Sequence, residues 1–165
     1  MRTPTTARAD ADPPAGGFDE AYRRLRPGMV RLAHLLTGSV EAAEDVVHDA
    51  FLACSRRWST LESPDAYVRR AVVNQARSSL RQAGRDRDKA DRFGRAAPIT
   101  VGMPDIDDLW DALRLLPDRQ RMALVLRFYQ DLALADIAGL LDCRLGTVKS
   151  LIHRGLARLS QEVRP

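Results

Sequence analysis

The side chains best suited to chemistry lie close together near the C-terminus, between residues 144 and 159. If this stretch is helical, steps of about 100° per residue gather its apolar residues on one side. That side holds Val148, Ile152, Gly155, Leu156 and Leu159. The opposite side holds Thr147, Ser150, His153 and Arg154, with Lys149 on the flank. The outer face is therefore basic and rich in hydroxyl groups, which can donate hydrogen bonds to a ligand.

The segment before this helix supplies the geometry for such binding. A short apolar helix is predicted from Leu134 to Leu141, a break follows at 142–144, and the second helix begins near Gly146. Two helices joined by so tight a turn form a helix-turn-helix, whose second helix fits the major groove of DNA. The alternative is an ordinary corner between two helices with a solvated polar face.

The rest of the chain offers no catalytic set. The three histidines, His34, His48 and His153, are scattered, without metal-ligand spacing or a nucleophile–base pair. Cys54 and Cys143 lack a CxxC or Cys/His cluster, which predicts two reduced packing residues. We therefore predict no catalytic residue, no metal and no cofactor.

Length and charge narrow the class of protein. The 165 residues suit one ordinary domain or two small ones, and no apolar run approaches the ~20 residues that cross a bilayer. The N-terminus lacks the apolar core of a signal peptide, so we expect a cytoplasmic protein without membrane insertion. Residues 63–96 include nine basic and four acidic residues, and residues 144–165 include five basic residues and one acidic residue. Two separate basic segments indicate two contacts with a polyanion.

No segment has the period of a strand, so the predicted fold is all-α, with two small helical domains joined by a flexible linker. The predicted limits are a disordered tail at 1–17, a first domain at 18–85, a linker at 86–105 and a second domain at 106–165. The first domain is predicted to hold helices from Phe18 to Leu36 (kinked or split at Pro27-Gly28), from Val40 to Trp58, and from Ser63-Pro64 to Gln82 or Gly84.

Two helices of the first domain carry contrasting outer faces. The second helix presents acidic residues together with His48, and this face could be merely solvated. The third presents arginines, Asn74 and serine beside the aromatic residues Trp58 and Tyr67. Aromatic rings near arginines suit unstacked bases, although either ring could belong to the core.

With these motifs in order, the chain resembles an extracytoplasmic-function sigma factor, the smallest type of bacterial sigma subunit, over residues 18–162. In the first domain the resemblance rests on the run from Ala43 to Phe51, on Tyr67 followed seven residues later by Asn74, and on Arg81. In the second it rests on Leu116-Pro117-Asp118-Arg119-Gln120-Arg121, on Asp136-Ile137-Ala138 and on Gly146-Thr147-Val148-Lys149-Ser150.

The resemblance implies a region 2-like first domain, a region 4-like second domain and three binding surfaces. Docking on the clamp-helices coiled coil of the largest subunit of core RNA polymerase would use Glu44, Asp45, His48 and Asp49. Melted promoter DNA at the -10 element would be held by Tyr67, Asn74, Arg77, Ser78 and Arg81. Duplex DNA at the -35 element would be read by Arg144, Thr147, Lys149, Ser150, His153 and Arg154. An anti-sigma factor is a further candidate partner.

Several positions depart from the family pattern. The family usually has Gln at His48, Trp at Tyr67 and Asp or Asn at Ser78, and alanine is usual at Gly155. These departures bear on the promoter sequence rather than on the class. Two rival classes are a dimeric operator-binding regulator, which needs a dimerisation or ligand domain, and an enzyme, which needs a catalytic set.

Overall fold

The computed structural model describes residues 16–93 and 107–162, and every regular element within them is helical. The order is α1 (Phe18–Thr37), α2 (Val40–Ser55), the 3₁₀ turn η1 (Trp58–Thr60), α3 (Pro64–Phe93), α4 (Asp107–Leu113), α5 (Asp118–Leu124), the π-helical turn η2 (Val125–Tyr129), α6 (Leu134–Leu140) and α7 (Leu145–Glu162). The prediction of an all-α fold is confirmed.

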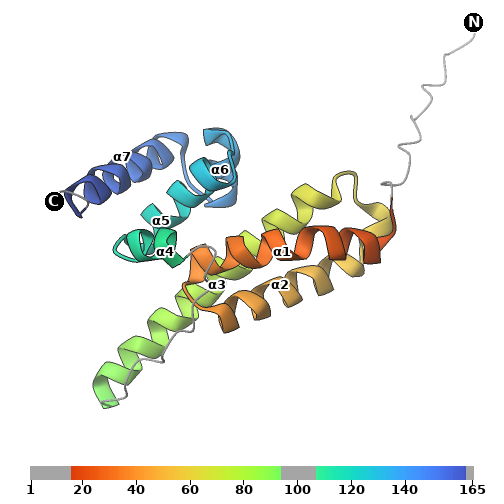
Figure 1. The fold of residues 1–165 in the computed structure, drawn as a ribbon, viewed down its shortest axis with the longest axis horizontal. Coiled ribbons are helices and arrows are strands. Elements are labelled where there is room, and N and C mark those ends of the chain that lie inside the picture. The colour runs from red at the N-terminus through yellow and green to blue at the C-terminus, as the bar shows by residue number, and fades with distance from the viewer. Residues whose placement is uncertain (1–15, 94–106, 163–165) are drawn as a thin grey trace, which may run out of the picture.

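The helices form two groups that touch (Figure 1). Helices α1, α2 and α3 lie side by side, and we call them the N-terminal bundle. The group from α4 to α7, which we call the C-terminal bundle, lies against one end of α1 and contacts α3 through α6. Most of the predicted tail at 1–17 and of the predicted linker at 86–105 lies outside the described residues. The predicted domain limits remain a prediction.

A kink or a split was predicted at Pro27-Gly28. Helix α1 is continuous through Pro27, so the split does not occur. Proline removes one backbone donor from the helix, but Pro27 is exposed, and buried residues hold α1 to the core on both sides of it. The helix ends at Thr37, one residue after the predicted end at Leu36. Gly38 adopts the left-handed conformation (φ 77°), and its N–H donates to the carbonyl of His34 at 2.7 Å.

Helix α3 extends further than predicted. It begins at Pro64, as expected, but continues past Gly84 to Phe93. A single glycine disfavours a helix by only about 1 kcal/mol, and the arginines and the lysine that follow are good helix formers. By contrast, the helix predicted to reach Trp58 stops at Ser55, and Trp58 opens the 3₁₀ turn instead.

One apolar cluster holds both bundles together. In the N-terminal bundle, Phe51 is 2% exposed and meets the rings of Phe18 and Tyr22 edge-on, with centroids 6.2 and 4.9 Å away. Trp58 meets Phe18 at 5.3 Å, so it belongs to this aromatic core rather than to an open surface. Aromatic pairs in this geometry add about 0.5–1.5 kcal/mol beyond the area they bury.

A π-helical turn interrupts the α-helical repeat of the C-terminal bundle. Met122, Leu124 and Val125, before it and at its start, are buried. At the turn the N–H of Gln130 bonds the carbonyl of Val125 at 3.1 Å, five residues back rather than four. The wider turn changes the direction of the side chains that follow, and Phe128 is left 62% exposed.

Candidate functional site

The second helix of the helix-turn-helix presents the polar face that its sequence predicts. Helix α6 packs on α7 across a turn in which Asp142 adopts the left-handed conformation (φ 49°), which aspartate tolerates better than most residues. The N–H of Cys143 donates to the carbonyl of Ala138 at 3.0 Å and closes this turn. On the inner side, Ile137 and Val148 are both fully buried.

The outer side of the motif is open. We call it the recognition face; its residues, all exposed, are Arg144, Thr147, Lys149, Ser150, His153 and Arg154. The described structure therefore brings together every residue predicted for duplex contact. The predicted apolar side of α7 is buried only in part. Gly155 is buried because Leu124 of α5 lies against it, whereas Leu156 is 45% exposed.

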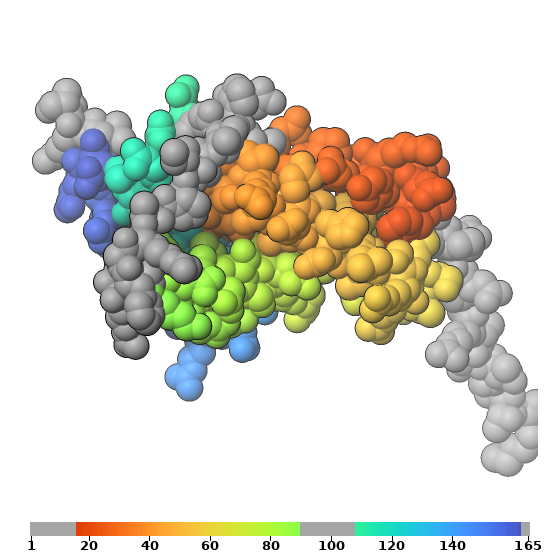
Figure 2. All heavy atoms as spheres, turned by 90° about the horizontal axis from the view of Figure 1, so that it is seen from below, coloured from red at the N-terminus to blue at the C-terminus, as the bar shows by residue number. Residues whose placement is uncertain are grey.

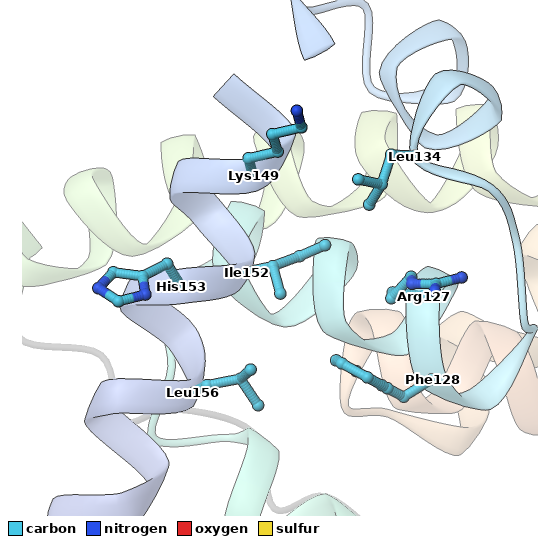
Figure 3. A pocket seen from close by; sticks show the side chains of 7 residues that line it. All are labelled: Arg127, Phe128, Leu134, Lys149, Ile152, His153 and Leu156. Atoms are coloured by element: carbon cyan, nitrogen blue, oxygen red, sulfur yellow. The ribbon is translucent and has the colours of Figure 1, made fainter. Parts of the chain in front are cut away.

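Leu156 belongs to a shallow apolar groove beside the recognition face (Figure 3). Phe128, Leu134, Ile152 and Leu156 supply the apolar part of its lining, and Arg127, Lys149 and His153 complete it. The groove thus adds apolar carbon beside the donors and positive charge of the recognition face, and Lys149 and His153 lie where the two meet.

The predicted acidic surface lies on α2. We call it the acidic face; it comprises Glu44, Asp45, His48 and Asp49. Asp45, His48 and Asp49 are exposed, whereas Glu44 is half-buried and forms an ion pair with Arg26 of α1. Arg26 therefore orients Glu44, and the three exposed side chains carry the accessible part of this face.

The predicted contacts to melted DNA lie along α3, on what we call the α3 face: Tyr67, Asn74, Arg77, Ser78 and Arg81. Asn74, Ser78 and Arg81 are exposed, and Arg81 donates to the Ser78 hydroxyl at 3.3 Å. The Tyr67 ring is half-buried, with the guanidinium of Arg57 5.8 Å from its centroid. Arg77 differs from the rest, because it donates to the carbonyl of Leu140 in α6 at 3.0 Å.

Comparison with known proteins decides the class. Residues 21–86 match the family described as sigma-70 region 2, and residues 106–159 match sigma-70 region 4. The RNA polymerase sigma-E factor of Streptomyces coelicolor is 30% identical over 151 residues, covering 88% of this chain and 85% of that protein. The ECF RNA polymerase sigma factor SigM of Mycobacterium tuberculosis is 31% identical over 156 residues, covering 87% of this chain and 76% of that protein.

The chain belongs to the extracytoplasmic-function family of RNA polymerase sigma factors. Solved structures agree with the assignment. The sigma factor RpoE from Bartonella quintana, in a co-crystal with the anti-sigma factor NepR, matches with a TM-score of 0.69 and 25% identity over 90% of this chain and 98% of that one. The sigma factor SigJ of Mycobacterium tuberculosis, at 22% identity and a TM-score of 0.61, shares the fold.

The same comparisons place this protein among the sigma factors, the DNA-binding initiation factors of RNA polymerase. In the described residues no cluster of three or more His, Cys, Asp or Glu could hold a metal. No described helix is both long and apolar enough to span a bilayer. Burial raises the pKa of the Cys54 thiol to about 11, so this cysteine remains protonated at neutral pH.

Sequence reasoning missed the residues that join the two bundles of this sigma factor. Arg121 is 4% exposed and donates to the carbonyl of Leu36, at the end of α1, from two nitrogens at 3.3 and 2.9 Å. Desolvation by burial lowers its pKa, while Asp118, 2.8 Å away, opposes that shift. Nothing in the sequence separates Arg121 from Arg119 two positions earlier, because its burial comes from a helix 85 residues away.

Proposed function

We propose that this sigma factor docks on core RNA polymerase through the acidic face, engages the melted -10 element with the α3 face, and reads duplex DNA at the -35 element with the recognition face. On this proposal the N-terminal bundle is the polymerase and -10 domain, and the C-terminal bundle is the -35 domain. The domain limits proposed from sequence are 18–85 and 106–165.

The observation that carries the proposal is the joint exposure of the six recognition-face residues on a helix-turn-helix with a closed apolar interior. A helix that enters the major groove needs an uncovered polar side and a rigid base. Val148 and Ile137 supply the base, since both are fully buried between α6 and α7. Arg144, Lys149 and Arg154 supply positive charge for the phosphates.

The acidic face supports docking on a basic protein surface. Asp45 and Asp49 project from the same helix with exposed carboxylates. Complementary charge steers such an encounter and fixes its orientation. The clamp-helices coiled coil of the largest polymerase subunit is the surface that the family resemblance implies for this helix.

The α3 face supports contact with an unpaired strand. Asn74 offers an amide that can bond a base edge, and the half-buried ring of Tyr67 lies at the start of the same helix. Arg81 adds positive charge along the strand's path. Stacking and backbone charge are the usual components of single-strand binding.

Three further expectations belong to the same proposal. The protein works in the cytoplasm, where polymerase and chromosomal DNA are found. It contributes no catalytic group, because polymerase performs the chemistry of RNA synthesis. An anti-sigma factor is a candidate partner, since the similar sigma factor of Bartonella quintana was solved with one.

Run-off transcription tests the proposal. Core RNA polymerase with this protein is expected to give discrete transcripts from a genomic promoter library, whereas core enzyme alone gives none of them. Mapping the start sites then defines the -10 and -35 sequences. Transcription that never exceeds the core-only background across the library would refute the proposed function.

A further inference from the structure

Two arginines join the bundles by reciprocal capping of helix ends. Arg121 of α5 donates from Nε and Nη2 to the carbonyl of Leu36 in the last turn of α1, at 3.3 and 2.9 Å. Arg77 of α3 donates from Nη1 to the carbonyl of Leu140, the last residue of α6, at 3.0 Å. Carbonyls in the last turn of a helix lack intrahelical partners and carry its negative dipole end, so each is a favourable acceptor for a guanidinium.

The contact beside Arg121 is closely packed. The ring of Trp110 lies so near Gly38 that a Cβ atom built on this glycine would stand 2.2 Å from the ring. The guanidinium of Arg121 lies 5.2 Å from the centroid of the same ring, within range of a cation–π interaction. The site therefore depends on a glycine from one bundle and on a tryptophan and an arginine from the other.

The contact beside Arg77 runs along α3. One side of α3 is set against the C-terminal bundle, and besides Arg77 it contributes Arg69, whose Nε donates to the side-chain oxygen of Gln130 at 3.1 Å. Figure 2 shows α3, in yellow to green, with blue atoms of the C-terminal half emerging beside it. Among the five residues of the α3 face, all of which the structure describes, Arg77 alone forms a hydrogen bond to the other bundle.

The other two binding surfaces remain open in this arrangement. All six residues of the recognition face are exposed, and so are Asp45, His48 and Asp49 of the acidic face. Of the three binding surfaces, only the α3 face takes part in the contact between the bundles, and it does so through Arg77. A closed molecule can meet polymerase and duplex DNA, but Arg77 has to leave the Leu140 carbonyl before it can meet a melted strand.

We propose that Arg121, Trp110, Gly38 and Arg77 form an autoinhibitory clasp that holds the free protein closed and withholds Arg77 from the -10 strand. The clasp is a conformational equilibrium within one chain. Its effect on DNA rests on the proposed function, because it assumes that Arg77 contacts the melted strand. A competent state that is populated only in part lowers the apparent affinity for its ligand by that fraction.

Energy transfer between two dyes on the full-length chain tests the clasp. Ala53→Cys on α2 and Ala157→Cys on α7 provide exposed attachment points in a Cys143→Ser background, and the buried Cys54 is left in place. Two variants act from opposite bundles: Arg121→Gln removes the cap on α1, and Gly38→Ala drives a methyl group into Trp110. Both are expected to shift the population from high to low transfer.

A matched control is available on the same helix. Arg119 also donates to a main-chain carbonyl, that of Leu141 at 3.5 Å, but within its own bundle. Arg119→Gln should leave the transfer unchanged. If Arg121→Gln loses helicity, Gly38→Ala still decides the question, because the C-terminal bundle is then unaltered. Low transfer in the unmodified protein, or unchanged transfer in helical Gly38→Ala, would overturn the clasp.

Binding of a labelled single strand carrying the mapped -10 sequence tests the gating. Loss of the charge-assisted hydrogen bond in Arg121→Gln should shift the equilibrium by about tenfold or more. If the free protein is mostly closed, Arg121→Gln and Gly38→Ala should therefore both bind this strand about tenfold more tightly than the unmodified protein. Separation of the bundles without tighter binding would overturn the gating. If run-off transcription fails, the proposed function is refuted. The energy-transfer measurement would still show whether the clasp exists, because it does not depend on DNA.

Discussion

Lys149 is exposed on the flank of α7, where an ammonium group reaches a phosphate more readily than a base edge. We expect Lys149→Ala to weaken binding to every duplex alike and to reduce the salt slope by about one unit, because one released counterion is lost. Fluorescence anisotropy on the mapped -35 duplex and a scrambled duplex, over a series of salt concentrations, measures both effects.

Ser150 is the matched control, since it is exposed on the recognition face and uncharged. Ser150→Ala should alter the preference between the two duplexes and leave the salt slope unchanged. If Lys149→Ala instead alters preference at constant slope, its assignment to phosphate is wrong.

The two cysteines should differ in reactivity. Burial raises the pKa of Cys54 to about 11, so roughly one thiol in a thousand is ionised at pH 8, whereas Cys143 is partly exposed. Iodoacetamide at pH 8 should label Cys143 first in the native protein, and Cys54 only after unfolding. Peptide mass spectrometry reads the sites. Equal labelling of both in folded protein would contradict the burial of Cys54.

At the scale of the element, α2 is expected to make the principal contact with polymerase. Asp45→Arg and Asp49→Arg should each weaken binding to core enzyme by more than about 1 kcal/mol, roughly fivefold in Kd, because charge reversal adds repulsion to the lost attraction. Biolayer interferometry with immobilised core enzyme measures the affinity, and circular dichroism checks the helicity.

Glu62 provides the control for this helix, being an exposed acid outside α2. Glu62→Arg makes the same change in net charge and should leave the affinity for core enzyme unaltered. Equal losses in all three variants would point to net charge, and no loss in any would mean that the acidic face is only solvated.

On α3, Asn74 is expected to hold an unstacked base. Asn74→Ala should slow promoter melting by about fivefold, the equivalent of one hydrogen bond of about 1 kcal/mol, while binding to core enzyme and to the -35 duplex is unchanged. Permanganate footprinting of the holoenzyme measures melting, and a template already unpaired at the -10 element should restore part of the loss. Normal melting by the variant would exclude Asn74 from the contact.

Helical periodicity predicted these elements well wherever one face of a helix is buried by its own neighbours. The inner and outer sides of α7 follow this rule from Val148 to Arg154. The prediction fails at Gly84, because one glycine is too weak to stop α3. The π-helical turn at Val125–Tyr129 changes the period locally, and the sequence pattern did not indicate it. Binding residues were predicted by residue type. Those of the recognition face are all exposed, and their contacts with DNA remain a prediction.

Contacts between the bundles could not be predicted in this way. Arg121 and Trp110 have ordinary positions in amphipathic helices, and their surroundings are completed by Leu36 and Gly38 from the distant α1. A local pattern carries no information about a neighbour so far along the chain. For the same reason, Arg77 was predicted as a DNA contact without its partner in α6.

At the scale of the whole molecule, one apolar cluster that runs through both bundles should couple their unfolding. We expect a single transition in differential scanning calorimetry, with equal calorimetric and van't Hoff enthalpies. Trp110→Ala removes a half-buried ring from the junction, at a cost of about 2 kcal/mol, and should divide the trace into two transitions. Two transitions in the unmodified protein would mean that the bundles fold independently.

Across the junction between the bundles, both arginines of the clasp bond main-chain oxygens rather than side chains. Every residue type presents the same oxygen at positions 36 and 140, so either position can change over evolutionary time without loss of its hydrogen bond. Substitutions on opposite sides of these bonds therefore need not compensate one another. Methods that infer contacts from correlated substitutions in related sequences should find little signal at these two bonds, even where relatives retain them.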